Sequence, residues 1–468
     1  MHAVTADQPL ALAAPSADDG IWAPARRRLT LGLVLTITLV AFEALAISTV
    51  MPVVAADLGG LGLYGWVFSG FFLGSLLGIV LAGRAADRRG TAAPFLAGLF
   101  LFAVGLLAGG LAPSMALLVA ARAAQGIGAG AIPAIAYASV GRSYPPAVRP
   151  RVFAVFSSAW VIPGLIGPAA SSAIAGAWSW RLVFLALLPF VALAAVITLP
   201  ALSRTEGPRP DADGVPPEDD RRGHGVQLTV GVALVLGSIS GPPPLVAVPL
   251  AALGVPVAVR AFLRLVPEGT LRLAVGMPAA ILVRGILTFA FFGTDAYVSL
   301  SFQDVRHQPT WVAGAALTAC TLCWTAAAWV QERWIHRVGP RRVVGTGFVI
   351  LAVSIALMFG VLGSLPIVLA VGVWGLGGFA IGLAYAPLSV TVLGLAEPGH
   401  EGTASASLQL TDVLGIALGA GLGGAFVALG EAQGWATRSA LELAFTCTLA
   451  VAIGGIFAAR RLPASLPT

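Results

Sequence analysis

Apolar stretches of about twenty residues recur along almost the whole chain, separated by short polar or glycine-rich breaks. Of its 468 residues, 58% are hydrophobic and 10% are charged. A helix of that length spans the hydrocarbon core of a bilayer, where every backbone polar group must be hydrogen-bonded within the segment. The chain is therefore predicted to be an all-α integral membrane protein.

We expect fourteen transmembrane helices, arranged as six, two and six. Their expected positions are 30–52, 64–83, 92–112, 115–139, 152–176, 181–202, 226–241, 244–264, 273–302, 310–331, 342–363, 365–393, 403–429 and 437–459. The middle pair is the weakest part of this prediction, because 226–241 is barely long enough to cross. A re-entrant or surface hairpin is the alternative there, since a chain of twelve helices would have the same orientation.

The expected domains follow from these spans. They are a disordered cytoplasmic tail (1–28), an N-terminal six-helix bundle (29–203), a cytoplasmic linker (204–225), two inserted transmembrane helices (226–265), a C-terminal six-helix bundle (266–461) and a cytoplasmic tail (462–468). Arg26, Arg27 and Arg28 resemble a twin-arginine export signal. Glu43 and the many later spans instead favour a first helix that is retained.

Arginine placement predicts the orientation in the membrane. The chain has 27 arginines and no lysine. With the N-terminus inside, 22 arginines fall in cytoplasmic segments, three (Arg181, Arg306 and Arg438) in outer loops, and two (Arg122 and Arg284) within spans. Cytoplasmic loops of membrane proteins carry an excess of basic residues. Both termini are therefore expected to be cytoplasmic, in a multi-pass protein of the cell membrane.

The residue inventory argues against several classes of function. A nucleotide-binding P-loop and a Schiff-base enzyme both need a lysine, so we expect no nucleotide and no cofactor, and uphill transport would draw on an ion gradient. The arginines lie between spans, which argues against nucleic acid as a partner. Cys320 and Cys323 lack the further ligands of a metal site and are expected to pack between helices. We predict no metal site and no enzymatic activity, because no catalytic cluster is visible.

A charged turn bounded by glycines lies between the second and third expected helices, with four charged residues in eight positions. It resembles the loop motif G-x-L-a-D-R-x-G-R-R of the major facilitator superfamily. The matching residues are Gly83, Asp87, Arg88 and Gly90. Ala85 replaces the usual leucine, and the trailing basic pair is absent. The resemblance implies a conformational latch, and a plain turn on the basic side of the membrane is the alternative.

Two further motifs resemble the same family. In the fourth helix, the run R-A-A-Q-G-I-G from Arg122 to Gly128 matches R-x-x-Q-G-x-G. In the first helix, Glu43 and Pro52 keep the spacing of the D-x-T…P motif, with glutamate in place of aspartate. Both motifs place a charged side chain within an apolar span, which is costly and usually functional.

The fifth helix carries an antiporter-like motif. Gly164, Gly167 and Pro168 resemble the family's G-P motif. The copy departs from the pattern, because Pro163 stands where the first glycine is expected and Ser171-Ser172 replace a pair of glycines. A packing face of small residues with a proline kink is the alternative interpretation.

Taken together, the motifs and the span count resemble the fourteen-helix drug/proton antiporter group of that superfamily. The resemblance implies two six-helix bundles around a central cavity, with the extra helix pair between them. A weak internal repeat is consistent with two related bundles, because Gly339 lies 249 residues after Gly90, in a second charged loop at the corresponding place of the second half.

Two acids within the spans are expected to carry protons. Glu43 lies near the middle of the first helix, and Arg122 is its predicted counter-charge because the first and fourth helices are neighbours in the resembled fold. Asp295 lies in the counterpart of the first helix in the second bundle. We therefore predict proton coupling through Glu43, Asp295 and Arg122. The alternatives are a static buried pair for Glu43 and Arg122, and a merely solvated Asp295 near the outer surface.

Charged and aromatic side chains of the spans are expected to line the substrate cavity. The candidates are Arg284, Tyr137, Trp374, Tyr385 and Asp412. Arg284 precedes Asp295 by about three helical turns, so the two share a face but lie too far apart to pair. The alternatives are that Asp412 caps a kink or binds a backbone group, and that the aromatic rings face lipid or other helices.

The sequence thus predicts a proton-coupled exporter of amphiphilic organic compounds or drugs that works by alternating access, as a monomer in the lipid bilayer. Two alternatives stay open. One is a metabolite facilitator or importer on the same fold. The other is a membrane receptor or scaffold that does not transport, against which the charges within the spans argue.

Overall fold

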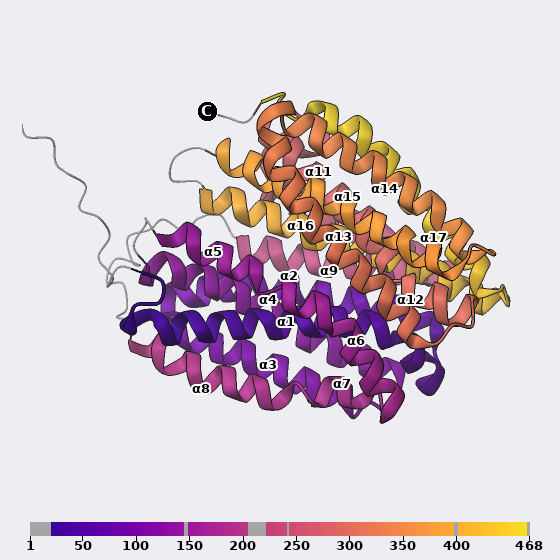
Figure 1. Cartoon of the computed structure of the whole chain (residues 1–468), viewed down its shortest axis with the longest axis horizontal. Coiled ribbons are helices and arrows are strands. Elements are labelled where there is room, and N and C mark those ends of the chain that lie inside the picture. The colour runs from indigo at the N-terminus through magenta and orange to yellow at the C-terminus, as the bar shows by residue number, and fades with distance from the viewer. Residues whose placement is uncertain (1–19, 145–147, 205–220, 241–242, 397–400, 466–468) are drawn as a thin grey trace, which may run out of the picture.

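The computed structural model describes residues 20–144, 148–204, 221–240, 243–396 and 401–465. All regular structure in these ranges is helical (Figure 1). Most of the helices are long and apolar. The N-terminal half contains α1 (Pro24–Leu58), α2 (Tyr64–Arg89), α3 (Ala92–Gly110), α4 (Met115–Ser143), α5 (Arg149–Ser158), α6 (Val161–Ala177), α7 (Arg181–Leu185) and α8 (Leu188–Arg204).

The second half follows a central helix pair. That pair is α9 (Arg221–Ile239) and α10 (Pro244–Leu265). Beyond it lie α11 (Met277–Asp295), α12 (Val298–Leu300), α13 (Thr310–Val338), α14 (Pro340–Leu362), α15 (Ile367–Gly394), α16 (Glu401–Gln433) and α17 (Thr437–Ala458). Short 3₁₀ turns at Leu61–Leu63, Thr270–Arg272 and Ala459–Arg461 and a π turn at Ser301–Val305 complete the described elements.

Prolines divide two spans that the sequence predicts as continuous helices. Pro163 has no N–H to bond the carbonyl of residue 159, and the helix is interrupted between α5 and α6 at that level. Pro189 has the same effect on the carbonyl of residue 185, where α7 ends. The predicted helices 152–176 and 181–202 are therefore each two helices in the structure.

The two halves form side-by-side bundles with the same internal packing (Figure 1). In the N-terminal bundle α4 packs against α2 and α3, and α1 packs against α6 and α8. In the C-terminal bundle α15 packs against α13 and α14, and α11 packs against α16 and α17. The charged loops also correspond, because Gly90 and Gly339 end α2 and α13 with φ of 78° and 79°. The internal repeat inferred from the loops is thus present in the backbone.

The bundles join along two seams, α2 against α16 and α6 against α13. Gly65 and Gly424 let α2 and α16 approach so closely that a Cβ on either would collide with the other backbone. Nearby, the rings of Tyr64 and Tyr297 lie 5.6 Å apart between centroids. Nε2 of Gln303 donates to the carbonyl of Thr49 at 3.0 Å. These contacts lie toward the end of the helices that carries the arginine-poor loops.

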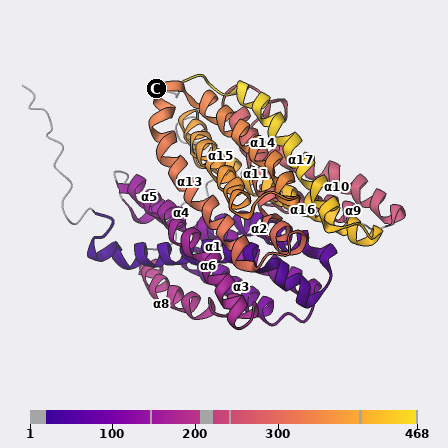
Figure 2. The ribbon, with the colours of Figure 1, turned by 45° about the vertical axis from the view of Figure 1, so that its right-hand side comes forward.

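The central pair α9 and α10 forms a hairpin whose helices pack on each other, and α9 contacts α2 and α16. Figure 2 shows this pair at the edge of the molecule. Within the described residues, twelve helices are long and apolar enough to cross a membrane, and α10 is one of them. The apolar parts of α6 and α9 are shorter, at Val161–Ala177 and Gly223–Ile239. The predicted count of fourteen crossings is therefore not confirmed by helix length.

The ends of the helices correct three predicted boundaries. α1 begins at Pro24, inside the segment predicted as a disordered tail, because proline suits the first turn of a helix. α9 begins at Arg221, inside the predicted linker 204–225, of which 205–220 lie outside the described residues. The predicted tail 462–468 is also partly packed, since Nε of Arg341 donates to the carbonyl of Leu462 at 2.8 Å.

Candidate functional site

Buried charges mark the candidate site, and in the N-terminal bundle they belong to Glu43 and Arg122. The side chains are 1% and 2% exposed, and Nη1 of Arg122 forms an ion pair with Oε1 of Glu43. The predicted counter-charge is therefore correct. The pair joins α1 to α4 at a depth where both helices are enclosed by neighbouring helices.

Arg122 has several partners besides Glu43. Its Nη1 donates to Oε1 of Gln125 at 2.8 Å, and its Nε donates to the carbonyl of Val67 at 3.3 Å. The guanidinium also lies 4.1 Å from the centroid of the Phe71 ring. Oε2 of Glu43 and Nε2 of Gln125 have no hydrogen-bond partner among the described residues. The cluster thus holds the arginine at several points and leaves one oxygen of the carboxyl unengaged.

A second ion pair lies in the C-terminal bundle, between Arg284 of α11 and Asp412 of α16. Nε of Arg284 is 2.7 Å from Oδ1 of Asp412, and the hydroxyl of Tyr385 donates to Oδ2 at 2.9 Å. Nη1 of Arg284 donates to the carbonyl of Tyr385 at 2.7 Å and to the hydroxyl of Ser389 at 3.2 Å. The alternative interpretation of Asp412 as a kink cap or backbone acceptor is wrong for its side chain, which binds two side chains of other helices.

Asp295 lies at the end of α11, apart from that pair. Its Oδ1 accepts a hydrogen bond of 2.7 Å from Nε1 of Trp374 on α15. Trp374 is fully buried, so in this conformation its ring packs inside the bundle. The residue is half-buried and engaged, which disfavours the alternative of a merely solvated acid.

Aromatic rings connect Asp295 with the Arg284–Asp412 pair. Phe291 stacks on Trp374 at 5.1 Å and meets Trp324 edge-on at 5.7 Å. Trp324 in turn meets Tyr385 at 5.4 Å. The sequence analysis missed Trp324, although it follows Cys323 directly within an apolar run. Only the packing of α13 against α15 shows that this ring belongs to the cluster.

The remaining predicted site residues lie elsewhere. Tyr137 is 39% exposed and packs 6.0 Å from the ring of Phe156, away from the two ion pairs. The side chains of Asp87 and Arg88 and the surroundings of Gly83 lie outside what the structure describes, although their backbone continues α2 to Arg89.

The antiporter-like motif lies on the seam between the bundles. A Cβ at Gly164 would collide with Thr321 of α13, and the backbone at Pro168 borders Gly314 of the same helix. Gly167 faces α1 instead, near Phe42 and Leu45. Small residues thus serve close helix approach here, as the packing interpretation expected.

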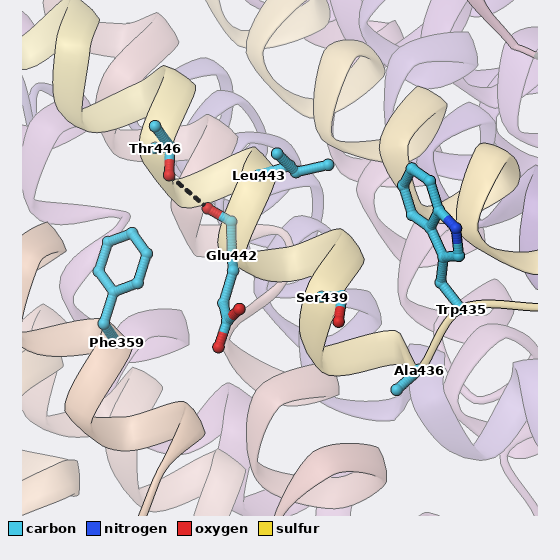
Figure 3. A pocket seen from close by; sticks show the side chains of 7 residues that line it. All are labelled: Phe359, Trp435, Ala436, Ser439, Glu442, Leu443 and Thr446. Carbon is cyan, nitrogen blue, oxygen red and sulfur yellow. Dashed lines mark hydrogen bonds between the residues drawn. The ribbon is translucent and has the colours of Figure 1, made fainter.

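A surface pocket of about 620 Å³ lies at the arginine-poor end, between α14 and α17. Figure 3 shows its lining, with the carboxylate of Glu442 on the side of Phe359. Arg438 pairs with that carboxylate at 2.8 Å, and both side chains are exposed. Such exposed pairs contribute little, so this pocket lacks the buried charge that distinguishes the interior clusters.

Comparisons with known proteins agree with this architecture. A family model described as "Major Facilitator Superfamily" matches residues 33–333, nearly two thirds of the chain. A probable multidrug-efflux transporter of Mycobacterium tuberculosis is 28% identical, over 90% of this chain and 92% of the relative. The methylenomycin A resistance protein of Streptomyces coelicolor is 27% identical, over 84% of this chain and 83% of the relative.

A solved structure shares the fold across almost the whole chain. It is a bacterial homologue of the human lysosomal transporter Spinster, in an inward-facing and unoccupied conformation. The TM-score is 0.65 at 16% identity, covering 94% of this chain and 98% of that one. Identity this low supports the fold alone.

Proposed function

The chain belongs to the major facilitator superfamily, and we propose that it exports amphiphilic organic compounds or drugs in exchange for protons. Each cycle would alternate the access of an interior site between the two membrane faces. Export is supported by the two relatives named for drug efflux and resistance, which align over most of this chain. Proton coupling is supported by the geometry of the N-terminal bundle.

The observation that carries the proposal is the buried ion pair of Glu43 and Arg122. Removing two charges from water is costly, and a pair this deep is retained only where it serves packing or function. A proton arriving at Glu43 would cancel the carboxylate charge and leave Arg122 to Gln125 and the carbonyl of Val67. The Glu43 contact ties α4 to α1, the Val67 contact ties α4 to α2, and Gln125 lies on α4 itself. Protonation would therefore weaken the link between α1 and α4 and leave the link between α4 and α2.

The substrate site would draw on the C-terminal bundle. Trp324 and Tyr385 are half-buried aromatic side chains beside the charged pair of Arg284 and Asp412. Aromatic faces next to a few polar groups suit molecules with an apolar body and a charged or polar end. This is the arrangement expected for amphiphilic organic compounds.

The membrane topology that fits these data has fourteen crossings and cytoplasmic termini in the cell membrane. The apolar helix Gly223–Ile239 has 17 residues and is about 25 Å long, which is short for a hydrocarbon core of about 30 Å. The packing of α9 on α10 supports a crossing all the same, as does the exposed apolar surface of α10, where Leu245 is 87% exposed. The arginine excess at one end supports the orientation.

A labelling experiment tests that topology. Pro243 is exposed beside the tight turn between α9 and α10. In a variant whose three native cysteines are replaced, Pro243→Cys should react with a membrane-impermeant maleimide added to intact cells. Reaction only after the cells are permeabilised would place the turn inside or within the membrane and contradict two crossings.

The transport test begins with a toxicity panel in a host that lacks its own exporters. The compound against which this chain protects best is then followed in inverted membrane vesicles, with and without an imposed proton gradient. Glu43→Gln should abolish gradient-driven transport while protein levels stay normal. Glu442→Gln is the matched control, because that acid is exposed and lies away from both interior pairs.

Three outcomes would contradict the proposal. Undiminished gradient-driven transport by Glu43→Gln would remove the proton role of that residue. Substrate movement in the opposite direction would identify an importer, and the absence of flux for every compound would favour the receptor or scaffold.

A further inference from the structure

The charged loop of the C-terminal half, Ile335 to Arg342, lines a pocket of about 520 Å³ at the arginine-rich end of the molecule. We call it the basic pocket. Its lining consists of Ile335, Arg337, Val338, Gly339, Arg341, Arg342, Ala464 and Ser465. The volume falls in the range of roughly 300–1,000 Å³ that is usual for small-molecule sites.

All charged residues that line the basic pocket are positive. Arg337, Arg341 and Arg342 contribute three positive charges, and the lining contains no acid. None of the three forms an ion pair within the described part of the chain, and their side chains are exposed. The corresponding loop of the first half contains Asp87, whereas His336 precedes Arg337 here. The second loop therefore lacks the acid that would neutralise it from within.

The backbone closes the pocket on two sides. The segment carrying Ala464 lies so close to Gly339 that a Cβ at Gly339 would collide with the carbonyl of Ala464. Arg341 holds this segment through its bond to the carbonyl of Leu462. Beside it, α14 begins at Pro340. The N–H of Val343 donates to the carbonyl of Gly339, and the N–H groups of Arg341 and Arg342 lie before it in the first turn, where a helix has no carbonyl of its own to bond them.

The basic pocket lies where the helices leave the apolar core. The apolar segment of α13 ends at Ile335, that of α14 begins at Pro340, and the one formed by α17 and the 3₁₀ turn after it ends at Arg461. Trp334 is 42% exposed and lies three residues before Arg337, on the same face of α13. Tryptophan at such a position is typical of the interface between lipid tails and headgroups.

We propose that the basic pocket binds a phosphate group, as carried by the headgroup of an anionic phospholipid. The three guanidinium groups supply forked N–H donors that suit phosphate oxygens, and the start of α14 adds a favourable field. A lipid headgroup and a free phosphate share this chemistry. The position of the pocket at the membrane boundary, beside the exposed Trp334, favours the lipid.

Native mass spectrometry of the purified full-length protein tests the site, with phosphatidylglycerol titrated against phosphatidylcholine. The test variant is Arg337→Gln/Arg342→Gln, which spares the hydrogen bond of Arg341. The control is Arg260→Gln/Arg264→Gln, which removes the same charge from exposed positions on α10 at the same end. The test variant should bind phosphatidylglycerol about thirtyfold more weakly, since each basic residue near an anionic surface contributes about a factor of five. The control should bind like the parent protein.

Inorganic phosphate and glycerol 3-phosphate are added in separate arms to identify the source of the phosphate. Lipid binding that millimolar phosphate leaves unchanged supports the headgroup. Displacement of the lipid by either soluble compound supports the same site with a soluble phosphate as occupant. Equal binding of phosphatidylglycerol and phosphatidylcholine, or equal binding by the parent and the test variant, would overturn the proposal.

Discussion

Among the described residues, each bundle buries one ion pair, but the two pairs are built in opposite ways. In the N-terminal bundle the first helix contributes the acid, Glu43, and α4 contributes the base. In the C-terminal bundle the first helix, α11, contributes the base, Arg284, and the acid Asp412 comes from α16. The first pair is 1–2% exposed, whereas Asp412 is 13% exposed and also binds Tyr385.

Under the proposed function, this difference would correspond to a division of labour within a repeated fold. A carboxyl that is enclosed and bound mainly by one arginine changes its surroundings strongly when it gains a proton. The carboxyl of Asp412 also accepts a hydrogen bond from the hydroxyl of Tyr385 and lies beside half-buried aromatic rings, so it is better placed to contact a substrate. The proposal therefore gives proton coupling to the N-terminal pair and substrate contact to the C-terminal pair.

The largest expected effect comes from removing the arginine of each pair. Arg122→Leu should destabilise the protein by about 3–5 kcal/mol, because it leaves a buried carboxylate without its partner. Arg284→Leu should cost less, since the hydroxyl of Tyr385 still donates to Asp412. Thermal unfolding of both variants in the same detergent measures the order. Equal losses, or a larger loss for Arg284→Leu, would break the proposed contrast between the pairs.

Asp295→Asn should have an intermediate effect. Asparagine keeps an oxygen that accepts the hydrogen bond of Trp374, so the fold and the thermal midpoint should be preserved. If Asp295 contributes a proton to the cycle, transport should fall by about tenfold, the loss expected for one charge-assisted interaction. Transport equal to that of the parent protein would leave Glu43 as the acid of the cycle and assign Asp295 to packing.

The smallest expected effect concerns the charged loop of the N-terminal half. If the loop is the predicted latch, Asp87→Asn should slow transport about two- to fivefold, because it would remove a charge interaction worth about 1 kcal/mol. Initial rates of export at several substrate concentrations give this value. A normal rate would identify the segment as a turn without a latch.

The sequence predicted the elements that depend on local chemistry. Apolar length located the spans, and the placement of arginine predicted which ends share one side of the membrane. The partnership of Glu43 and Arg122 was also accessible, because both are charges in apolar helices that neighbour each other in the resembled fold. The proline breaks before Pro163 and Pro189 were accessible in principle, since proline excludes a specific backbone hydrogen bond.

The C-terminal site needed the three-dimensional structure. Arg284 and Asp412 are 128 residues apart, and α11 and α16 must pack in one register for them to meet. The analogy between the first helices of the two bundles predicted that an acid of α11 would be the counterpart of Glu43, whereas the ion-paired residue of α11 is Arg284. That prediction led to Asp295, which binds Trp374 instead of a charged partner. Repeat symmetry thus predicted the backbone of the second bundle better than the chemistry of its side chains.

The most direct test of the account is proton movement driven by substrate in sealed proteoliposomes without an imposed gradient. A substrate gradient across the parent protein should move protons in the opposite direction, recorded with a trapped pH-sensitive dye. Glu43→Gln should still exchange labelled for unlabelled substrate but move no protons, and Glu442→Gln should behave like the parent. Substrate-driven proton movement through Glu43→Gln at the parental rate would contradict the assignment of coupling to the Glu43–Arg122 pair.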